Sequence, residues 1–194
     1  SNFSELKNDT TPSYFLCMTS YIDEEYPQVP VLFDKEKIKS TLSEYLSKLG
    51  LKQLKIAETE KYAHVTYFFN GGEEKPFEGE KRILVNSPRD VETYDLKPEM
   101  SAHEVLEKLS LELLSPDFSL YVVNFANPDM VGHTGNYEAS IKAVETIDNC
   151  LSKLKKISLQ SNISMLITAD HGNCDQMVYE DGSPHTSHSK AKVP

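Results

Sequence analysis

Two Asp–His pairs are the residues of this sequence with the clearest chemical potential. One pair is Asp129 and His133, and the other is Asp170 and His171. Carboxylate oxygens and imidazole nitrogens are the usual protein ligands of zinc and manganese. Asp129 and His133 are four residues apart, so one helical turn would direct both side chains at a single ion. Together the two pairs predict a binuclear metal site.

A third histidine-containing run, His185-Thr186-Ser187-His188, lies in a polar stretch near the end of the chain. On its own this run would be an ordinary turn. Beside the two Asp–His pairs it is expected to supply one more metal ligand. The chemistry of the side chains leaves open whether that ligand is His185 or His188.

Lys61 is a further candidate, in the charged run over residues 58–64. A lysine beside a metal site neutralises a phosphate oxygen as a point charge. The alternative is that this run is only an exposed charged turn. His64, in the same run, is interpreted as a packing or capping residue rather than a ligand.

Alternating strand and helix patterns must position these residues. Apolar, β-prone stretches predict strands over residues 14–22, 52–57, 83–85, 120–125 and 163–168. Helical periodicity predicts helices over residues 35–49, 101–114 and 136–155. Residues 59–72 carry both strand and helix signals, and we interpret them as helix. This alternation predicts an α/β fold with a mostly parallel sheet and helices on both of its faces.

Each Asp–His pair follows directly after one of the predicted buried strands, 120–125 or 163–168. In open α/β sheets, ligands bind outside the carboxyl ends of the strands. We therefore expect the candidate ligands to meet at one edge of the sheet.

Two helices carry further local signals. Ser101 and Glu104 form the pattern of a capping box, which predicts where the second helix begins. The third helix is expected to bury one apolar face. The residues of that face are Ile141, Val144, Ile147, Leu151 and Leu154.

Composition excludes several classes of function. The chain has 194 residues and a net charge of −10, which argues against nonspecific binding to nucleic acid or to an anionic membrane surface. No apolar run approaches the roughly 20 residues of a membrane-spanning helix. The cysteines Cys17, Cys150 and Cys174 are scattered and odd in number, as expected for reduced thiols in a cytoplasmic protein.

Several longer runs resemble cofactor-independent phosphoglycerate mutase, a family of the alkaline-phosphatase superfamily. The similarity extends from about residue 15 to the last residue and includes residues 18–21, 56–65, 69–72 and 93–101. It also includes both metal motifs, over residues 127–133 and 168–173. The metal motifs are typical of the whole superfamily, whereas the runs 58–65 and 94–101 are specific to the mutase.

The resemblance implies a mechanism at two manganese ions, without 2,3-bisphosphoglycerate as a cofactor. A serine would take the phosphoryl group from 3-phosphoglycerate and return it to the other hydroxyl, giving 2-phosphoglycerate. Asp129, His133 and His188 would hold one ion, and Asp170 and His171 would help to hold the other. Lys61 matches the lysine that contacts the phosphate. The intact enzyme is expected to be a cytoplasmic monomer that acts in glycolysis and gluconeogenesis.

The resemblance also implies what this chain lacks. The nucleophilic serine and a further Asp ligand belong to an N-terminal segment, and the substrate-binding arginines belong to a phosphotransferase domain. Neither is found in residues 1–194, so the chain is expected to be the C-terminal part of the phosphatase-type domain, an incomplete fold without mutase turnover of its own. Two alternatives remain: another metal-dependent phosphohydrolase of the superfamily, and a metal-binding module without catalytic activity.

Overall fold

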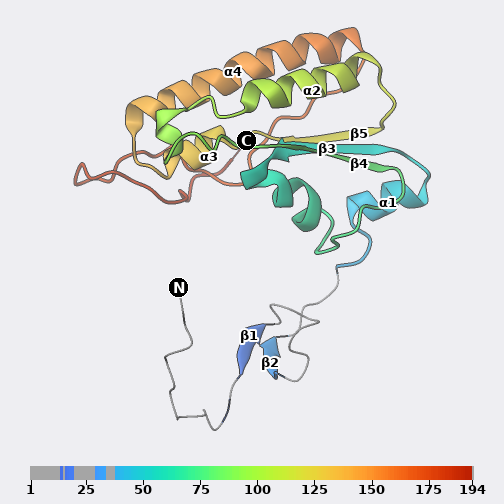
Figure 1. Ribbon diagram of the computed structural model, residues 1–194, viewed down its shortest axis with the longest axis horizontal. Coiled ribbons are helices and arrows are strands. Elements are labelled where there is room, and N and C mark those ends of the chain that lie inside the picture. Colours follow the sequence, from blue (N-terminus) through green and yellow to red (C-terminus); the bar gives the residue numbers. More distant parts are fainter. Residues whose placement is uncertain (1–13, 15, 20–28, 34–37, 194) are drawn as a thin grey trace. The chain divides into compact units, whose positions relative to one another are not determined.

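The computed structural model describes residues 14, 16–19, 29–33 and 38–193 (Figure 1). The chain divides into two compact units, residues 1–38 and 39–194. The first unit contains a two-stranded parallel sheet of β1 (Cys17–Thr19) and β2 (Val31–Phe33). The strand predicted over residues 14–22 is thus confirmed at its centre, and residues 15 and 20–22 lie outside the described residues.

The second unit is built on a three-stranded parallel sheet. Its strands are β3 (Gln53–Glu58), β4 (Glu80–Val85) and β5 (Leu120–Asn124), in the order β4-β3-β5. All six residues of the central strand β3 are buried. The predicted parallel α/β sheet is confirmed, with the ends of these three strands shifted by at most three residues.

Helices cover both faces of this sheet (Figure 1). On one face lie α2 (Ala102–Leu114) and α4 (Tyr137–Gln160), which pack together over the main hydrophobic core. On the other face lie α1 (Leu42–Lys48) and the helical turns that follow β3. None of the helices in the described part of the chain is long and apolar enough to cross a membrane.

The segment after β3 is helical, as predicted for residues 59–72. It consists of a 3-10 turn, η2 (Thr59–Lys61), and a short π-helix, η3 (His64–Phe68). Gly71 and Gly72 end it with positive φ angles of 68° and 90°, which glycine adopts without steric cost.

A buried polar network fastens this segment to the sheet. The fully buried ammonium of Lys55 on β3 donates hydrogen bonds to Ser43 of α1 and to Asn70, just after η3. It also lies 3.4 Å from Glu80 on β4. Burial lowers the pKa of Lys55 to about 8. Because a buried charge is costly unless it is paired, these contacts hold η3 against one face of the sheet.

The first helix begins later than predicted. It was expected from residue 35, but the structure begins it at Leu42, where Thr41 accepts a hydrogen bond from the backbone N–H of Glu44. Residues 34–37 lie outside the described residues. The apolar side chains that predicted the helix are exposed, including Leu42 and Tyr45.

The predicted capping box of α2 is wrong. Ser101 does flank the helix, but its hydroxyl donates to the carbonyl of Asn86 and caps no helical N–H. The backbone N–H of Ser101 donates instead to Glu58 at the end of β3, over 3.1 Å. The start of α2 is therefore fixed by tertiary contacts rather than by its own side chains.

The buried face of α4 differs from the predicted face. The helix begins after Asn136, whose side chain accepts from the N–H of Ala139. Ile141 and Val144 are exposed, whereas Ala139 and Ala143 are buried against Val131. Small side chains at these two positions allow the preceding helix, α3 (Asn127–Gly132), to approach closely. Further along α4, Ile147 and Leu154 do face the core, as predicted.

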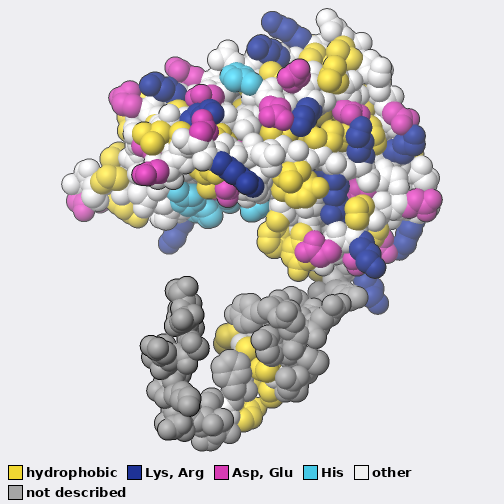
Figure 2. All heavy atoms as spheres, viewed as in Figure 1, with side chains coloured by type: hydrophobic (Ala, Val, Ile, Leu, Met, Phe, Trp, Pro, Cys, Tyr) yellow, Lys and Arg dark blue, Asp and Glu magenta, His cyan; other side chains and the backbone are white. Residues whose placement is uncertain are grey.

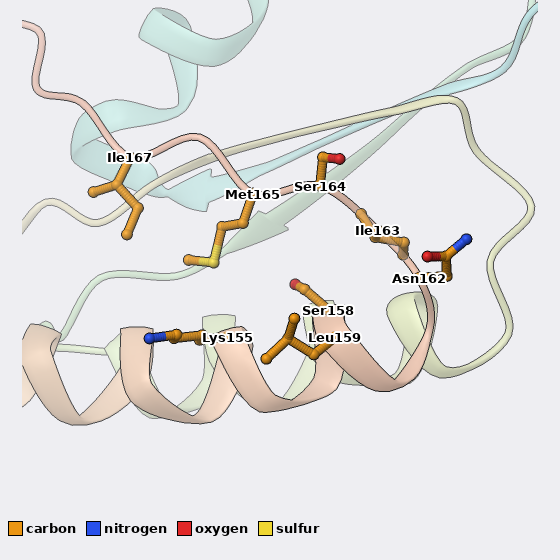
Figure 3. A pocket seen from close by; sticks show the side chains of 8 residues that line it. All are labelled: Lys155, Ser158, Leu159, Asn162, Ile163, Ser164, Met165 and Ile167. Carbon is orange, nitrogen blue, oxygen red and sulfur yellow. The ribbon is translucent and has the colours of Figure 1, made fainter.

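The strand predicted over residues 163–168 is also wrong. Residues 163–168 form no strand, and no strand of the described chain pairs with residues 163–167. Leu166 is 91% exposed and Ile167 is 53% exposed. Strand propensity expresses a fit to a pleated, half-buried surface, and most of these residues are exposed in the described structure instead. A hollow of about 470 Å³ lies between residues 155–159 of α4 and residues 162–167 (Figure 3).

Candidate metal centre

The candidate ligands meet at the carboxyl edge of the sheet. Asp129 lies on α3, which follows β5 almost directly, and His133 is the residue that caps this helix at its C-terminal end. Lys61 lies on η2, which follows β3. The loops over residues 170–173 and 185–189 complete the group. Figure 2 shows histidine side chains gathered together on one face of the molecule.

Asp129 is the centre of this group. Its Oδ1 lies 3.1 Å from Nε2 of His133, 3.4 Å from Nε2 of His188 and 3.9 Å from Nδ1 of His171. Its Oδ2 lies 2.6 Å from the ammonium of Lys61. A single carboxylate therefore lies close to the end of its own helix, to η2 and to two separate loops.

These distances fit a divalent metal ion. Two ligands about 2.1 Å from one ion, at angles of about 90° to 109°, are separated by about 3.0 to 3.4 Å. The Asp129–His133 and Asp129–His188 separations have these values. Ligand atoms of Asp129, His171 and His188 all lie within 4.8 Å of one another. The donor atoms are one carboxylate oxygen and imidazole nitrogens, which suit manganese, zinc and cobalt.

A hydrogen bond to the backbone orients the ring of His133. Its Nδ1–H donates to the backbone carbonyl of Thr186 over 2.7 Å. This bond places a proton on Nδ1, so that in the neutral imidazole the lone pair of Nε2 faces Asp129 and can bind a metal ion. Metal-binding histidines in proteins are commonly oriented by such a carbonyl.

Asn173 holds Asp129 in place and was not singled out as a site residue from the sequence. Its side-chain amide donates to Oδ1 of Asp129 over 2.8 Å and to the Asp129 carbonyl over 3.2 Å. A Cβ added to Gly132 would lie 2.3 Å from Asn173 Oδ1, so this contact requires glycine at position 132. Burial raises the pKa of Asp129, but hydrogen bonds from Lys61 and Asn173 outweigh it and hold the pKa below its ordinary value.

Asp170 is held more loosely than Asp129. Its side chain is 39% exposed, against 13% for Asp129. Its carboxylate oxygens lie 3.8 Å from Nε2 of His171 and 3.9 Å from the ammonium of Lys61. The structure thus brings all five predicted ligands and Lys61 together. The tightest group of donors draws on both predicted ligand sets, so the division between two ions stays a prediction.

The two histidines of the 185–188 run have different surroundings. His188 stacks on His171 with ring centroids 3.7 Å apart, close to Asp129. His185 is buried and packs against Tyr179 with ring centroids 4.5 Å apart. The geometry therefore favours His188 as the ligand.

Lys61 does not lie in an exposed turn. Its side chain is 6% exposed, and its ammonium reaches Asp129. His64 packs edge-on against Phe68, and burial followed by the charge of Lys61 lowers its pKa. Glu60, which precedes Lys61 in the same turn, accepts a hydrogen bond from the hydroxyl of Tyr94 over 2.7 Å. Neither Glu60 nor Tyr94 was predicted as a site residue.

Comparison with known proteins supports a metal-dependent enzyme. A sequence model of the metalloenzyme superfamily matches residues 16–194. The chain is 53% identical to the 2,3-bisphosphoglycerate-independent phosphoglycerate mutase of Acetivibrio thermocellus over 196 residues, covering all of this chain and 38% of that protein. It is 57% identical to the corresponding mutase of Lawsonia intracellularis over 177 residues, covering 91% of this chain and 34% of that protein.

A solved structure is similar as well. The phosphoglycerate mutase of Leishmania mexicana, crystallised at low cobalt concentration, matches with a TM-score of 0.82 and 30% identity. The match covers 96% of this chain and 38% of that structure. The resemblance to the mutase and the expected fold are thereby confirmed. The chain spans little more than a third of the length of the proteins that it matches.

Proposed function

Because the chain belongs to the metalloenzyme superfamily, we propose that it is the metal-binding part of a cofactor-independent phosphoglycerate mutase. Such an enzyme interconverts 3-phosphoglycerate and 2-phosphoglycerate. The observation that carries the proposal is the Asp129-centred cluster of carboxylate, imidazole and ammonium groups at the carboxyl edge of the sheet. The names of the similar proteins point to the same reaction.

Each residue of the cluster has a distinct role in this proposal. Asp129, His133 and His188 hold one divalent ion, and Asp170 and His171 contribute to a second. Both ions are manganese. Bound divalent ions lower the pKa of a hydroxyl nucleophile and offset the negative charge of phosphoryl oxygens.

Lys61 supplies a fixed positive charge for the substrate phosphate. Its ammonium is buried beside the cluster and lies within 3.9 Å of both aspartates. An ammonium in a largely desolvated site stabilises phosphoryl charge more strongly than one in water. In this proposal the nucleophilic serine and the arginines that bind the substrate lie on other segments of a longer polypeptide, and residues 1–194 are the C-terminal part of its phosphatase-type domain.

The proposal also covers the setting of the enzyme. The substrate is a small phosphorylated acid, and neither nucleic acid nor a membrane is a partner. The enzyme acts as a monomer in the cytoplasm. The net charge of −10 and the three free cysteines support this setting.

An assay of phosphoglycerate conversion in manganese tests the proposal. A mutase-length polypeptide that carries this chain is expected to convert 3-phosphoglycerate to 2-phosphoglycerate, and the 194-residue chain alone is not. Lys61→Met should lower kcat/KM by about 100-fold, as for other fixed donors in a desolvated site. Lys142→Met is the matched control, since Lys142 lies on an exposed position of α4, and it should have no effect.

Other results would contradict the proposal. Hydrolysis of a generic aryl phosphate without phosphoglycerate conversion would indicate a different phosphohydrolase. Manganese binding without any phosphoryl transfer, with Asp129→Ala and Lys61→Met affecting only stability, would indicate a metal-binding module. Conversion by the 194-residue chain alone would show that the reaction needs no other segment.

A further inference from the structure

The loop between β4 and α2 makes contacts that the proposed function does not use. It contains a 3-10 turn, η4 (Tyr94–Leu96). The ring of Tyr94 packs against Val131 of α3 and against Ala139 and Ala143 of α4. Its hydroxyl donates to Oε1 of Glu60 over 2.7 Å. One side chain thus contacts both the helix that carries Asp129 and the turn that carries Lys61.

The loop is tied independently to both ends of the α3 region. The side-chain amide of Asn127, at the start of α3, donates to the carbonyl of Pro98 over 2.8 Å. The side-chain amide of Asn136, at the start of α4, donates to Asp95 over 3.1 Å. Because the loop is held at two points on this side, Tyr94 keeps a fixed position relative to α3.

The other side of the contact is the turn η2. Glu60 precedes Lys61 directly, and the two residues belong to the same 3-10 turn. The Lys61–Asp129 contact of 2.6 Å joins two elements, η2 and α3, that are far apart in the sequence. The orientation of the Lys61 ammonium therefore depends on where η2 lies relative to α3.

The hydrogen bond from Tyr94 is suited to hold that orientation. Burial, and then the bond to Glu60, raise the pKa of Tyr94 to about 12. The hydroxyl thus remains a donor through the neutral and mildly alkaline range. A donor to a charged carboxylate forms a stronger bond than a donor to a neutral group.

We propose that Tyr94 is a positioning residue that acts through Glu60 to fix the ammonium of Lys61 at the anion-binding side of the cluster. Tyr94 itself contacts neither metal nor phosphate. The inference rests on the proposed function in one respect, namely that Lys61 binds the phosphate of the substrate.

Binding of inorganic phosphate tests this role without requiring turnover. Calorimetric titration of the manganese-loaded, mutase-length polypeptide is compared with that of its Tyr94→Phe variant, which keeps the ring and removes only the hydroxyl. The loss of one hydrogen bond predicts about fivefold weaker phosphate binding. Manganese affinity should stay within twofold, because Tyr94 contacts none of the ligand side chains in the described structure.

The Lys61→Met background separates positioning from general stability. In that background Tyr94→Phe should have no effect on phosphate binding, since the group that it positions is gone. Glu60→Gln keeps an acceptor oxygen and should stay within about threefold of the unaltered protein. Glu60→Ala removes the acceptor from an exposed side chain and should weaken phosphate binding by the same factor as Tyr94→Phe. It therefore tests the proposal independently if Tyr94→Phe does not fold. Tyr137→Phe, at an exposed tyrosine of α4, is the matched control.

The proposal is overturned if Tyr94→Phe and Glu60→Ala leave phosphate binding unchanged. It is also overturned if Tyr94→Phe weakens phosphate binding equally with and without Lys61, since the effect would then not pass through the lysine. A polypeptide that binds phosphate in this Tyr94-dependent way but converts no phosphoglycerate would contradict the proposed function alone.

Discussion

Two regions of this molecule share one sequence pattern, an apolar run followed by an Asp and a His, yet they fold differently. In the first, residues 120–124 pair with β3, and Asp129 is 13% exposed and contacts Lys61 and Asn173. In the second, residues 163–167 pair with no strand of the described chain, and Asp170 is 39% exposed. The same residue types thus give a preorganised carboxylate in one region and a loosely held one in the other.

The difference teaches that strand pairing, more than ligand identity, determines how well a site residue is held. The partner of β5 is β3, which is encoded within the same chain and is fully buried. Asp129 is held firmly because α3, on which it lies, begins three residues after the end of the paired strand β5. Residues 163–167, which precede Asp170, pair with no strand of the described chain, and its side chain is more exposed than that of Asp129. Metal sites depend on such supporting contacts as much as on the ligands themselves.

Hydrogen exchange should give the largest contrast between the two regions. Amides of β5 that bond to β3 exchange only through cooperative opening, whereas the amides of residues 164–167 are exposed without a strand partner in the described chain. We expect protection in β5 to exceed that of residues 164–167 by about 1000-fold or more. Equal protection in the two segments, measured by NMR or mass spectrometry on this chain, would show that the second region is paired after all.

Although the two aspartates lie in similar sequence motifs, their separate replacement should weaken manganese binding to different extents. Asp129→Ala removes the carboxylate that contacts Lys61 and lies nearest three histidines, and we expect manganese binding to fall by more than about 100-fold. Asp170→Ala should reduce it by about tenfold or less. Isothermal titration with manganese measures both variants. Comparable losses would show that Asp170 is as well organised as Asp129.

In the ordered region, the carboxyl of Glu58 should make the free energy of unfolding depend on pH. This fully buried carboxyl ends β3 and accepts from the N–H of Ser101, and burial raises its pKa from 4.5 to about 7. The folded state therefore binds a proton more tightly than the unfolded state. Glu58 thus contributes its full stabilising share below about pH 4.5, and this share is lost as the pH rises to 7.

Glu58→Gln should remove this dependence, because glutamine keeps the acceptor oxygen without a charge. At pH 8 the variant should gain up to about 3 kcal/mol in free energy of unfolding, and at pH 4.5 close to nothing. Urea denaturation at several pH values measures the difference. Parallel pH profiles for the two proteins would show that Glu58 is not the group that titrates.

A smaller effect than that of Asp129→Ala is expected when the support of Asp129 is removed. Asn173→Ala removes both hydrogen bonds to Asp129 and leaves the ligand in place, so manganese binding should weaken by about 10-fold. Gln176→Ala, an exposed position of the same loop, is the matched control. An unchanged affinity in Asn173→Ala would mean that Lys61 and α3 alone keep the carboxylate in position.

Much of the fold could be predicted from local sequence patterns, because β3 and β5 lie in apolar, β-prone stretches and α2 and α4 carry helical periodicity. The candidate ligands could be predicted from residue type and from their position after apolar runs. Both kinds of signal lie within a few residues of the feature that they specify, so neither needs knowledge of tertiary contacts.

The remaining features depend on contacts between distant segments. Ser101 has the residue types of a capping box, but Asn86 and Glu58 occupy its hydrogen-bonding groups. The buried face of α4 follows Ala139 and Ala143, because closeness to α3 matters more there than apolar size. Asn173 and Tyr94 support the site through side chains that meet only after folding, so no local pattern marks them.

Residues 163–167 have no strand partner among the described residues, and this has a consequence for handling the protein at high concentration. The segment combines Ile163, Met165, Leu166 and Ile167 without a charge or a proline, and β5 offers a second strand with one side open in the described chain. Such edges are templates for pairing between molecules, and short uncharged β-prone segments are typical starting points of amyloid-like assembly. We therefore expect loss of this chain from solution to proceed by intermolecular β-sheet growth rather than by amorphous collapse.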